Sequence, residues 1–201
     1  MSPPRSAVIR HFDAQAETYQ DRARHGLWAW QRRREAGAIL ALAGAMNGRS
    51  ALDLGAGAGF YARLLAERGA QPTVAVDASR AMVARIDHPG LEAIEGDIAT
   101  IRLGRRFDVV LLAGVLEFVD DAEAALLNAA RHLAVDGSMV LLVPTDNTGG
   151  RLYRRFHRRH GFAITLFGRH HVQQLAAVAG LALTAERPVA PFSAVYALAP
   201  R

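Results

Sequence analysis

The 201-residue sequence contains no cysteine. Disulfide bonds, thiolate metal sites and cysteine nucleophiles are therefore excluded. No apolar run reaches the ~20 residues that a membrane span needs, and the first residues lack the apolar core of a signal peptide. We therefore expect a cytoplasmic protein that folds as one domain around a packed core.

Lysine is absent too, so all 24 basic residues are arginine and the net charge is +5. We attribute this arginine usage mainly to a GC-rich genome and not to selection for binding nucleic acid. No recognition module is visible, and aromatic residues scarcely interleave the basic stretch. An RNA-modifying or RNA-binding protein is kept as an alternative, although nucleic acid is not the expected partner.

The most informative stretch that is present reads ALDLGAGAGF, residues 51–60. It predicts a buried strand, a glycine-rich turn and the start of a helix. Glycine lets the backbone approach a ligand closely, and the helix N-terminus favours negative charge at the same place. Asp77 ends the next apolar run, where a carboxylate would hold a ribose diol. The pattern therefore predicts a nucleotide-like ligand.

The glycine spacing narrows the choice of ligand. A dinucleotide fingerprint needs G-x-G-x-x-G, but this chain has Gly55, Gly57 and Gly59, with Phe60 at the position of the third fingerprint glycine. G-x-G-x-G after a strand that carries an acid, here Asp53, is the pattern of S-adenosylmethionine (SAM) binding. The sequence resembles the class I SAM-dependent methyltransferases of the small-molecule, quinone-biosynthesis-like kind. The resemblance covers residues 51 to about 143 well and implies SAM as cofactor.

Short apolar runs alternate with helical segments along most of the chain, which predicts a parallel sheet covered on both faces. With the resemblance, we expect a Rossmann-like α/β fold with a seven-stranded, mostly parallel sheet and an N-terminal helical cap. The expected strands are 51–54, 73–76, 91–95, 107–112, 138–143, 181–187 and an antiparallel 192–199. The expected helices are 6–22, 27–46, 60–68, 79–86, 121–133, a short one near 152–160, and 169–179. Asp136-Gly137 is expected to form a turn.

Within this single domain we expect a cap at 1–48 and a SAM-binding core at 49–201. A basic stretch at about 147–170 lies where the family inserts elements that cover the substrate.

The resemblance assigns roles to the cofactor residues. Asp77 would accept from both ribose hydroxyls, because a carboxylate is an acceptor only; alternatively it caps the following helix. Asp97 would accept from the adenine amino group with Ile98 against the ring, or else it is a turn acid. The expected cofactor-binding residues are Tyr19, Asp53, Gly55, Ala56, Gly57, Gly59, Phe60, Asp77, Ala78, Asp97, Ile98, Ala113 and Gly114.

Residues 111–121, LLAGVLEFVDD, correspond to the family's fourth motif beside the reactive methyl group. They lack the Pro-Pro-aromatic pattern used to methylate exocyclic amines of nucleic acids. Methyl transfer mainly requires that the reacting atoms be held in line, and a base is needed only when the nucleophile must lose a proton. The candidate bases are Glu117, His157 and His160. No metal is expected.

The expected acceptor-binding residues are Trp28, Tyr153, Arg154 and His157. The aromatic members could instead be ordinary packing, and the arginines a solvated helix face. We expect methyl transfer to a small molecule, with O-methylation favoured and an anionic or aromatic acceptor. A SAM-binding protein without catalytic activity is a further alternative, because catalysis by positioning leaves few obligatory residues. The sequence gives neither the oligomeric state nor the acceptor.

Overall fold

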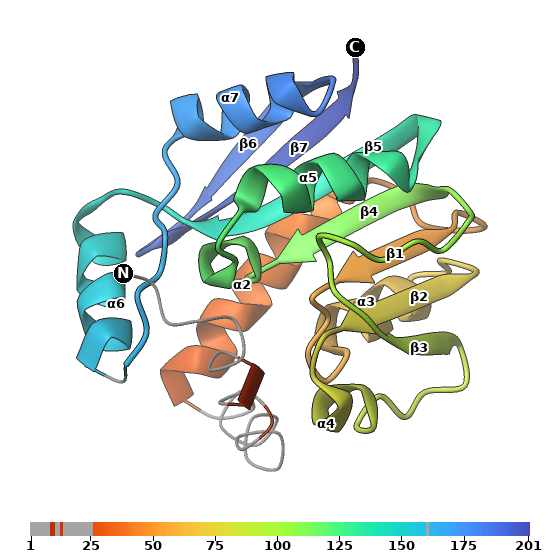
Figure 1. Cartoon of the computed structure of the whole chain (residues 1–201), viewed down its shortest axis with the longest axis horizontal. Helices are drawn as coiled ribbons and strands as arrows, with labels where there is room; N and C mark the ends of the chain where they lie inside the picture. Colours follow the sequence, from red (N-terminus) through yellow and green to blue (C-terminus); the bar gives the residue numbers. More distant parts are fainter. Residues whose placement is uncertain (1–8, 11–12, 14–25, 160) are drawn as a thin grey trace.

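The computed structural model describes residues 9, 10, 13, 26–159 and 161–201. Its centre is a seven-stranded sheet with the order β3-β2-β1-β4-β5-β7-β6 (Figure 1). The first five strands in this order are parallel, and β7 runs antiparallel to both of its neighbours. The predicted Rossmann-like fold, with its antiparallel last strand, is confirmed.

The strands form where the sequence has short apolar runs between turn residues. Residues of β1 are buried on both faces, whereas the edge strand β3 is largely exposed. The strands are β1 (Ala51–Leu54), β2 (Thr73–Asp77), β3 (Leu91–Glu95), β4 (Phe107–Ala113), β5 (Leu133–Pro144), β6 (Leu181–Val189) and β7 (Ser193–Pro200).

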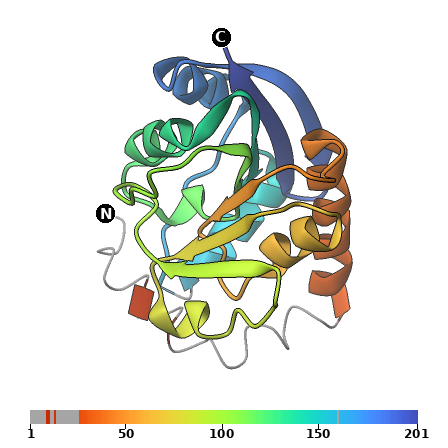
Figure 2. The ribbon, with the colours of Figure 1, turned by 90° about the vertical axis from the view of Figure 1, so that its right-hand side faces the viewer.

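Helices cover both faces of the sheet and divide the core in two. Alternate residues of β4 point to opposite faces, as the two-residue period of a strand requires. Val110 and Leu112 pack with α5 (Ala122–Arg131) and α7 (Arg169–Val178), whereas Val109 and Leu111 pack with α2 (Gly26–Ala43) and α3 (Phe60–Glu67). In Figure 2 the orange α2 lies on one side of the sheet, and the green α5 and blue α7 lie on the other.

Three further helical segments lie near the carboxyl ends of the parallel strands. These are α4 (Arg80–Val83), the 3₁₀ turn η1 (Leu116–Phe118) and α6 (Thr148–Arg159). Helix α4 is shorter than the predicted 79–86, and α6 begins before the predicted residue 152. Among the described residues, no helix is both long enough and apolar enough to cross a membrane.

The turn predicted at Asp136-Gly137 is wrong. These residues lie inside β5, which begins at Leu133 and not at Ser138. Phe107 of β4 pairs with Leu133, but Val109 pairs with Ser138, so the register shift absorbs the extra residues of β5. Asp136 and Gly137 thus form a bulge-like irregularity within β5 and do not end the strand.

The predicted helix 6–22 lies outside the described residues except for residues 9, 10 and 13. Helix α2 packs against β5, β6 and β7 and contributes Ile39 and Ala43 to the core. The division into a cap and a core at residue 48 stays a prediction.

Candidate active site

A cavity of about 500 Å³ opens at the carboxyl ends of the parallel strands. In the sheet, β2 and β3 lie to one side of β1, and β4 and β5 lie to the other. The strand order therefore reverses between β1 and β4. Parallel α/β sheets bind ligands at this point. The glycine loop and the residues after β2, β3 and β4 form its walls.

The glycine loop needs glycine for backbone conformation and for space. Gly55, Gly57 and Gly59 have φ values of 79°, 55° and 79°, in the left-handed region that other residues rarely adopt. A Cβ atom on Gly55 would lie 2.4 Å from a Val115 methyl carbon. The loop can therefore pass close to the residues after β4 only because it carries no side chains at these positions.

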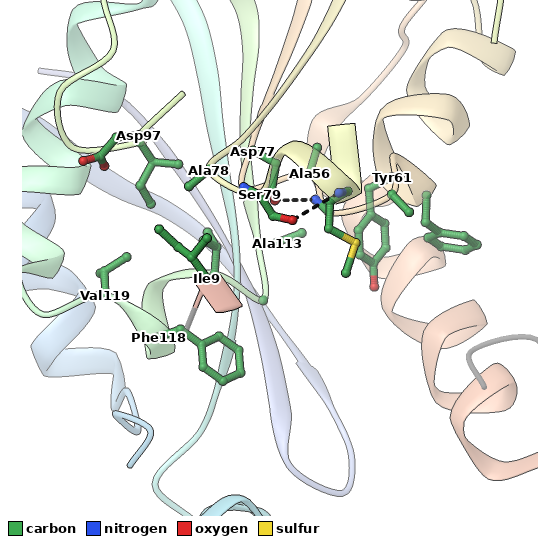
Figure 3. Close-up of a pocket in the computed structure, with 18 of the residues that line it drawn as sticks. Ile9, Ala56, Tyr61, Asp77, Ala78, Ser79, Asp97, Ala113, Phe118 and Val119 are labelled. Carbon is green, nitrogen blue, oxygen red and sulfur yellow. Dashed lines mark hydrogen bonds between the residues drawn. The ribbon is translucent and has the colours of Figure 1, made fainter. Parts of the chain in front are cut away.

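Asp77 anchors this loop to the end of β2. Its Oδ2 accepts the Gly57 backbone N–H at 2.7 Å, and its Oδ1 accepts the Ser79 backbone N–H at 2.8 Å (Figure 3). Each carboxylate oxygen keeps a second lone pair for a ligand hydroxyl. Burial raises the pKa of Asp77 above its ordinary value, while these backbone hydrogen bonds lower it. The alternative role as a helix cap falls to Ser79, whose Oγ accepts the Met82 N–H at 3.1 Å.

Asp97 lies at the opposite end of the cavity from Tyr61 (Figure 3). Its Oδ1 accepts the Ala99 backbone N–H at 2.8 Å, which shapes the turn after β3. Asp97, Ile98 and Ala99 all line the cavity. The turn role and the predicted adenine role are thus compatible at one carboxylate.

Two residues from the N-terminal part of the chain also reach this region. Ile9 lines the cavity, and the Ser79 hydroxyl donates a hydrogen bond to Asp13. Tyr19, one of the expected cofactor-binding residues, lies outside the described residues, as does His160, one of the candidate bases.

Glu117 lies behind the cavity wall at the end of β4. Its Oε1 is 3.8 Å from the position that a Cβ of Gly114 would occupy, and Gly114 and Ala113 line the cavity. Glu117 is 5% exposed, and its Oε2 accepts no hydrogen bond among the described residues. Burial, with the negative charge of Glu35 as a smaller cause, raises the pKa of Glu117 to about 8. Such a carboxyl exchanges a proton readily near neutral pH.

The comparisons with known proteins agree with this geometry. A family model described as a methyltransferase domain matches residues 27–186. The chain belongs to this methyltransferase family. The predicted class I SAM-dependent methyltransferase is thereby confirmed, while the roles of individual site residues stay predictions.

Individual relatives of the methyltransferase share sequence or fold. Cypemycin N-terminal methyltransferase from a Streptomyces species is 38% identical over 104 residues, which is 48% of this chain and 42% of that protein. The chain thus spans less than half the length of this curated relative. Magnesium protoporphyrin IX methyltransferase from Synechocystis, solved with bound SAH (S-adenosylhomocysteine), has a TM-score of 0.77 at 16% identity and covers 98% and 99% of the two chains. The DhpI–SAH complex has a TM-score of 0.74 at 21% identity, with 96% and 94% covered.

Asp53 tests whether the methyltransferase's own residues fit a cofactor whose amino-acid end carries an ammonium group. Its carboxyl is 1% exposed, and neither oxygen accepts a hydrogen bond among the described residues. Burial first, and the charge of Asp77 second, raises its pKa to about 7. An orphaned buried acceptor two residues before the glycine loop suits a donor or cation nearby. The loop, Asp77 and Asp97 line the cavity and fit SAM, whereas Asp53 is buried and is not itself a cavity-wall residue.

The predicted acceptor residues separate into two groups. The ring of Tyr153 stacks on Phe192 with centroids 4.5 Å apart, and Trp28 contacts both rings. The ring centroid of His157 lies 4.4 Å from that of Tyr153 and 5.7 Å from that of Phe118, which is a cavity-wall residue. These rings form a row from the cavity to α2. Arg154 does not join this row, because its side chain is exposed. None of the four predicted acceptor residues is itself a cavity-wall residue.

Phe60 also stands at the cavity, and the Arg32 guanidinium carbon lies 4.9 Å from the centre of its ring. A polar cluster that was not predicted from the sequence lies beside the cavity. It is formed by Gln31, Glu35, Tyr61 and Ser193, of which Glu35 is half-buried and the others are buried. The one available signal was the i,i+4 spacing of Gln31 and Glu35 within an otherwise apolar and basic helix.

Proposed function

We propose that this methyltransferase transfers a methyl group from SAM to a small-molecule acceptor that approaches between Gly114, Phe118 and the aromatic face of α6. The observation that carries this proposal is the arrangement of the cavity. A glycine loop anchored by Asp77 forms one part of its wall, and a buried, ionisable Glu117 lies behind another. One end is built to hold a nucleotide-like group and the other to handle a proton.

In this proposal each cofactor residue has a defined task. Asp77 accepts from the ribose hydroxyls, Asp97 accepts from the adenine amino group, and Ile98 packs against the adenine face. The glycine loop and Asp53 hold the amino-acid end. When bound, SAM supplies a methyl group on a positively charged sulfur. The chain's contribution is to fix that methyl group against the acceptor and to exclude water from the site.

The acceptor end favours a molecule with an aromatic or apolar body. Phe118, His157 and Tyr153 offer ring faces and edges next to the cavity, and such surfaces bind flat apolar groups. Glu117 is the proposed base for a nucleophile that must lose a proton, and His157 is the second candidate. The arginines of α6 have exposed side chains, so little supports the anionic acceptor expected from the sequence. An acceptor hydroxyl, which the sequence favoured, and an acceptor amine could both give a proton to such a base.

A direct assay tests this proposal. The protein would be incubated with SAM labelled on its methyl group and with separate pools of small phenols, alcohols, amines and carboxylic acids, plus a tRNA pool. We expect SAH and one labelled small-molecule product, and we expect Glu117→Gln to slow the transfer while it still binds SAH. Label in tRNA alone would support the RNA alternative. SAH binding without transfer to any pool would support a SAM-binding protein without catalytic activity.

A further inference from the structure

The polar cluster beside the cavity centres on Glu35 of α2. Its Oε1 accepts from the Ser193 hydroxyl at 2.6 Å and from the Gln31 amide nitrogen at 3.0 Å. Its Oε2 accepts from the Tyr61 hydroxyl at 3.2 Å. Glu35, which is half-buried, is thus held in one orientation by three neutral donors, and it forms no ion pair within the described part of the chain.

Two further oxygen atoms near this carboxylate lack donors. Glu117 Oε2 and Gln31 Oε1 are buried and accept no hydrogen bond within the described part of the chain. The Gln31 amide cannot be turned to correct this, because its nitrogen faces the Glu35 carboxylate, which can only accept. Buried polar atoms without partners are costly. The cluster therefore has unsatisfied oxygen atoms beside the Glu35 carboxylate. A ligand that brings both donors and a positive charge would satisfy these oxygens and favour the ionised form of Glu117.

This cluster adjoins both the cavity and the aromatic row. Tyr61, which donates to Glu35, lines the cavity, and so does Gly114, against which Glu117 lies. On the other side, Ser193 follows Phe192, whose ring stacks on Tyr153. Neither glutamate lines the cavity itself, but each lies directly behind a residue that does. A ligand that passes Tyr61 and Gly114 would therefore come from the cavity to both carboxyl groups.

We propose that the acceptor is an organic amine, bound as an ammonium ion between Glu35 and Glu117, with its apolar part against Phe192 and Tyr153. This inference rests on the proposed methyltransferase function and names its substrate class. An ammonium group has three N–H donors and a positive charge, whereas a hydroxyl has one donor and none. Aromatic faces add favourable contact with a cation. Within the described residues, no group of three or more metal-ligating side chains offers a metal site instead.

The reaction follows from this placement. The ammonium group gives one proton to the Glu117 carboxylate and becomes a neutral amine. The nitrogen lone pair then forms the new N–C bond to the methyl carbon as the C–S bond breaks and its electron pair stays on sulfur. The products are the N-methylammonium ion and SAH, and Glu117 passes its proton to water. Glu35 is the positioning residue, because it binds the cation without taking part in proton transfer.

Binding of matched probes to the SAH-saturated protein tests the inference. The probes are 2-phenylethylamine, 2-phenylethanol and 3-phenylpropanoate, which share an aromatic body and differ in charge. Saturation-transfer NMR and calorimetry should detect only the amine. Its affinity should fall at least about tenfold in Glu35→Gln and in Glu117→Gln, since each variant removes a carboxyl group that can pair with the ligand as a carboxylate. Glu123→Gln, which alters an exposed glutamate of α5, is the matched control and should not change it.

The outcomes separate this inference from the proposed function. If the alcohol or the acid binds as well as the amine, or if no amine binding occurs up to about 10 mM, the amine inference is overturned while SAH binding keeps the methyltransferase proposal intact. Failure of SAH itself to bind the folded protein would overturn the proposed function. If a glutamine variant does not fold, the comparison of the three probes on the unaltered protein still decides.

Discussion

Replacing Glu117 with glutamine should stabilise the ligand-free protein at alkaline pH. Burial raises the pKa of this carboxyl from 4.5 to about 8. Between these two values the unfolded chain has released the proton and the folded chain has kept it. The contribution of this group to the free energy of unfolding is therefore greatest below pH 4.5. It falls by about 1.4 kcal/mol per pH unit as the pH rises toward 8. The total loss from this one group is on the order of 4 kcal/mol by pH 8.

Glutamine has nearly the same shape and cannot ionise, so Glu117→Gln should lack this loss. Urea unfolding of the variant and the unaltered protein at pH 5 and at pH 8.5 measures the effect. The variant should have nearly the same unfolding free energy at pH 5 and exceed the unaltered protein by several kcal/mol at pH 8.5. Asp53, whose pKa is also raised, is present in both proteins and cancels in the difference. An equal difference at the two pH values, or a variant that is less stable at pH 8.5, would refute the reasoning. Glu123→Gln should show no such pH dependence.

Two substitutions test the local geometry of the site. Gly55→Ala should lower stability by at least about 2 kcal/mol and abolish SAH binding, because the new Cβ would combine a positive φ with contact against Val115. Gly104→Ala has a similar φ but open space around it, so it should cost only about 1 kcal/mol and leave binding unchanged; equal losses in both variants would count against the close approach. Ser79→Ala removes the acceptor for the Met82 N–H and should cost about 1 kcal/mol in unfolding free energy, whereas an unchanged melting curve would show that the cap contributes nothing.

The nucleotide end of the site could be predicted because its signals are local. The strands are short apolar runs, and the glycine spacing with Asp77 about 20 residues later fits one known arrangement. The anchoring role of Asp77 was not predicted. It depends on the path of the glycine loop, which brings the Gly57 N–H to the carboxylate 20 residues later in the sequence, and the residue sequence alone does not specify this path.

The acceptor end could not be predicted in the same way, because its parts come from distant segments. Ser193 lies 158 residues from Glu35 in the sequence, and Phe192 and Tyr153 meet only when β7 and α6 are both in place. The basic pattern of α6 drew attention to Arg154, but the arginines of this helix are exposed, and so are its apolar residues Leu152 and Phe156. The half-buried residues Tyr153 and His157, four positions apart, are the ones whose rings meet, and His157 also contacts the cavity-wall residue Phe118.

The most direct test of the central claim is calorimetric titration of SAH into the unaltered protein, into Asp77→Asn and into Asp97→Asn. Asparagine at position 97 can still accept the Ala99 N–H, so that variant keeps its turn. The account predicts one micromolar site in the unaltered protein and at least about tenfold weaker binding in each variant, with the variants still folded by circular dichroism. Absence of binding by the folded, unaltered protein would contradict the account, as would full affinity in both variants.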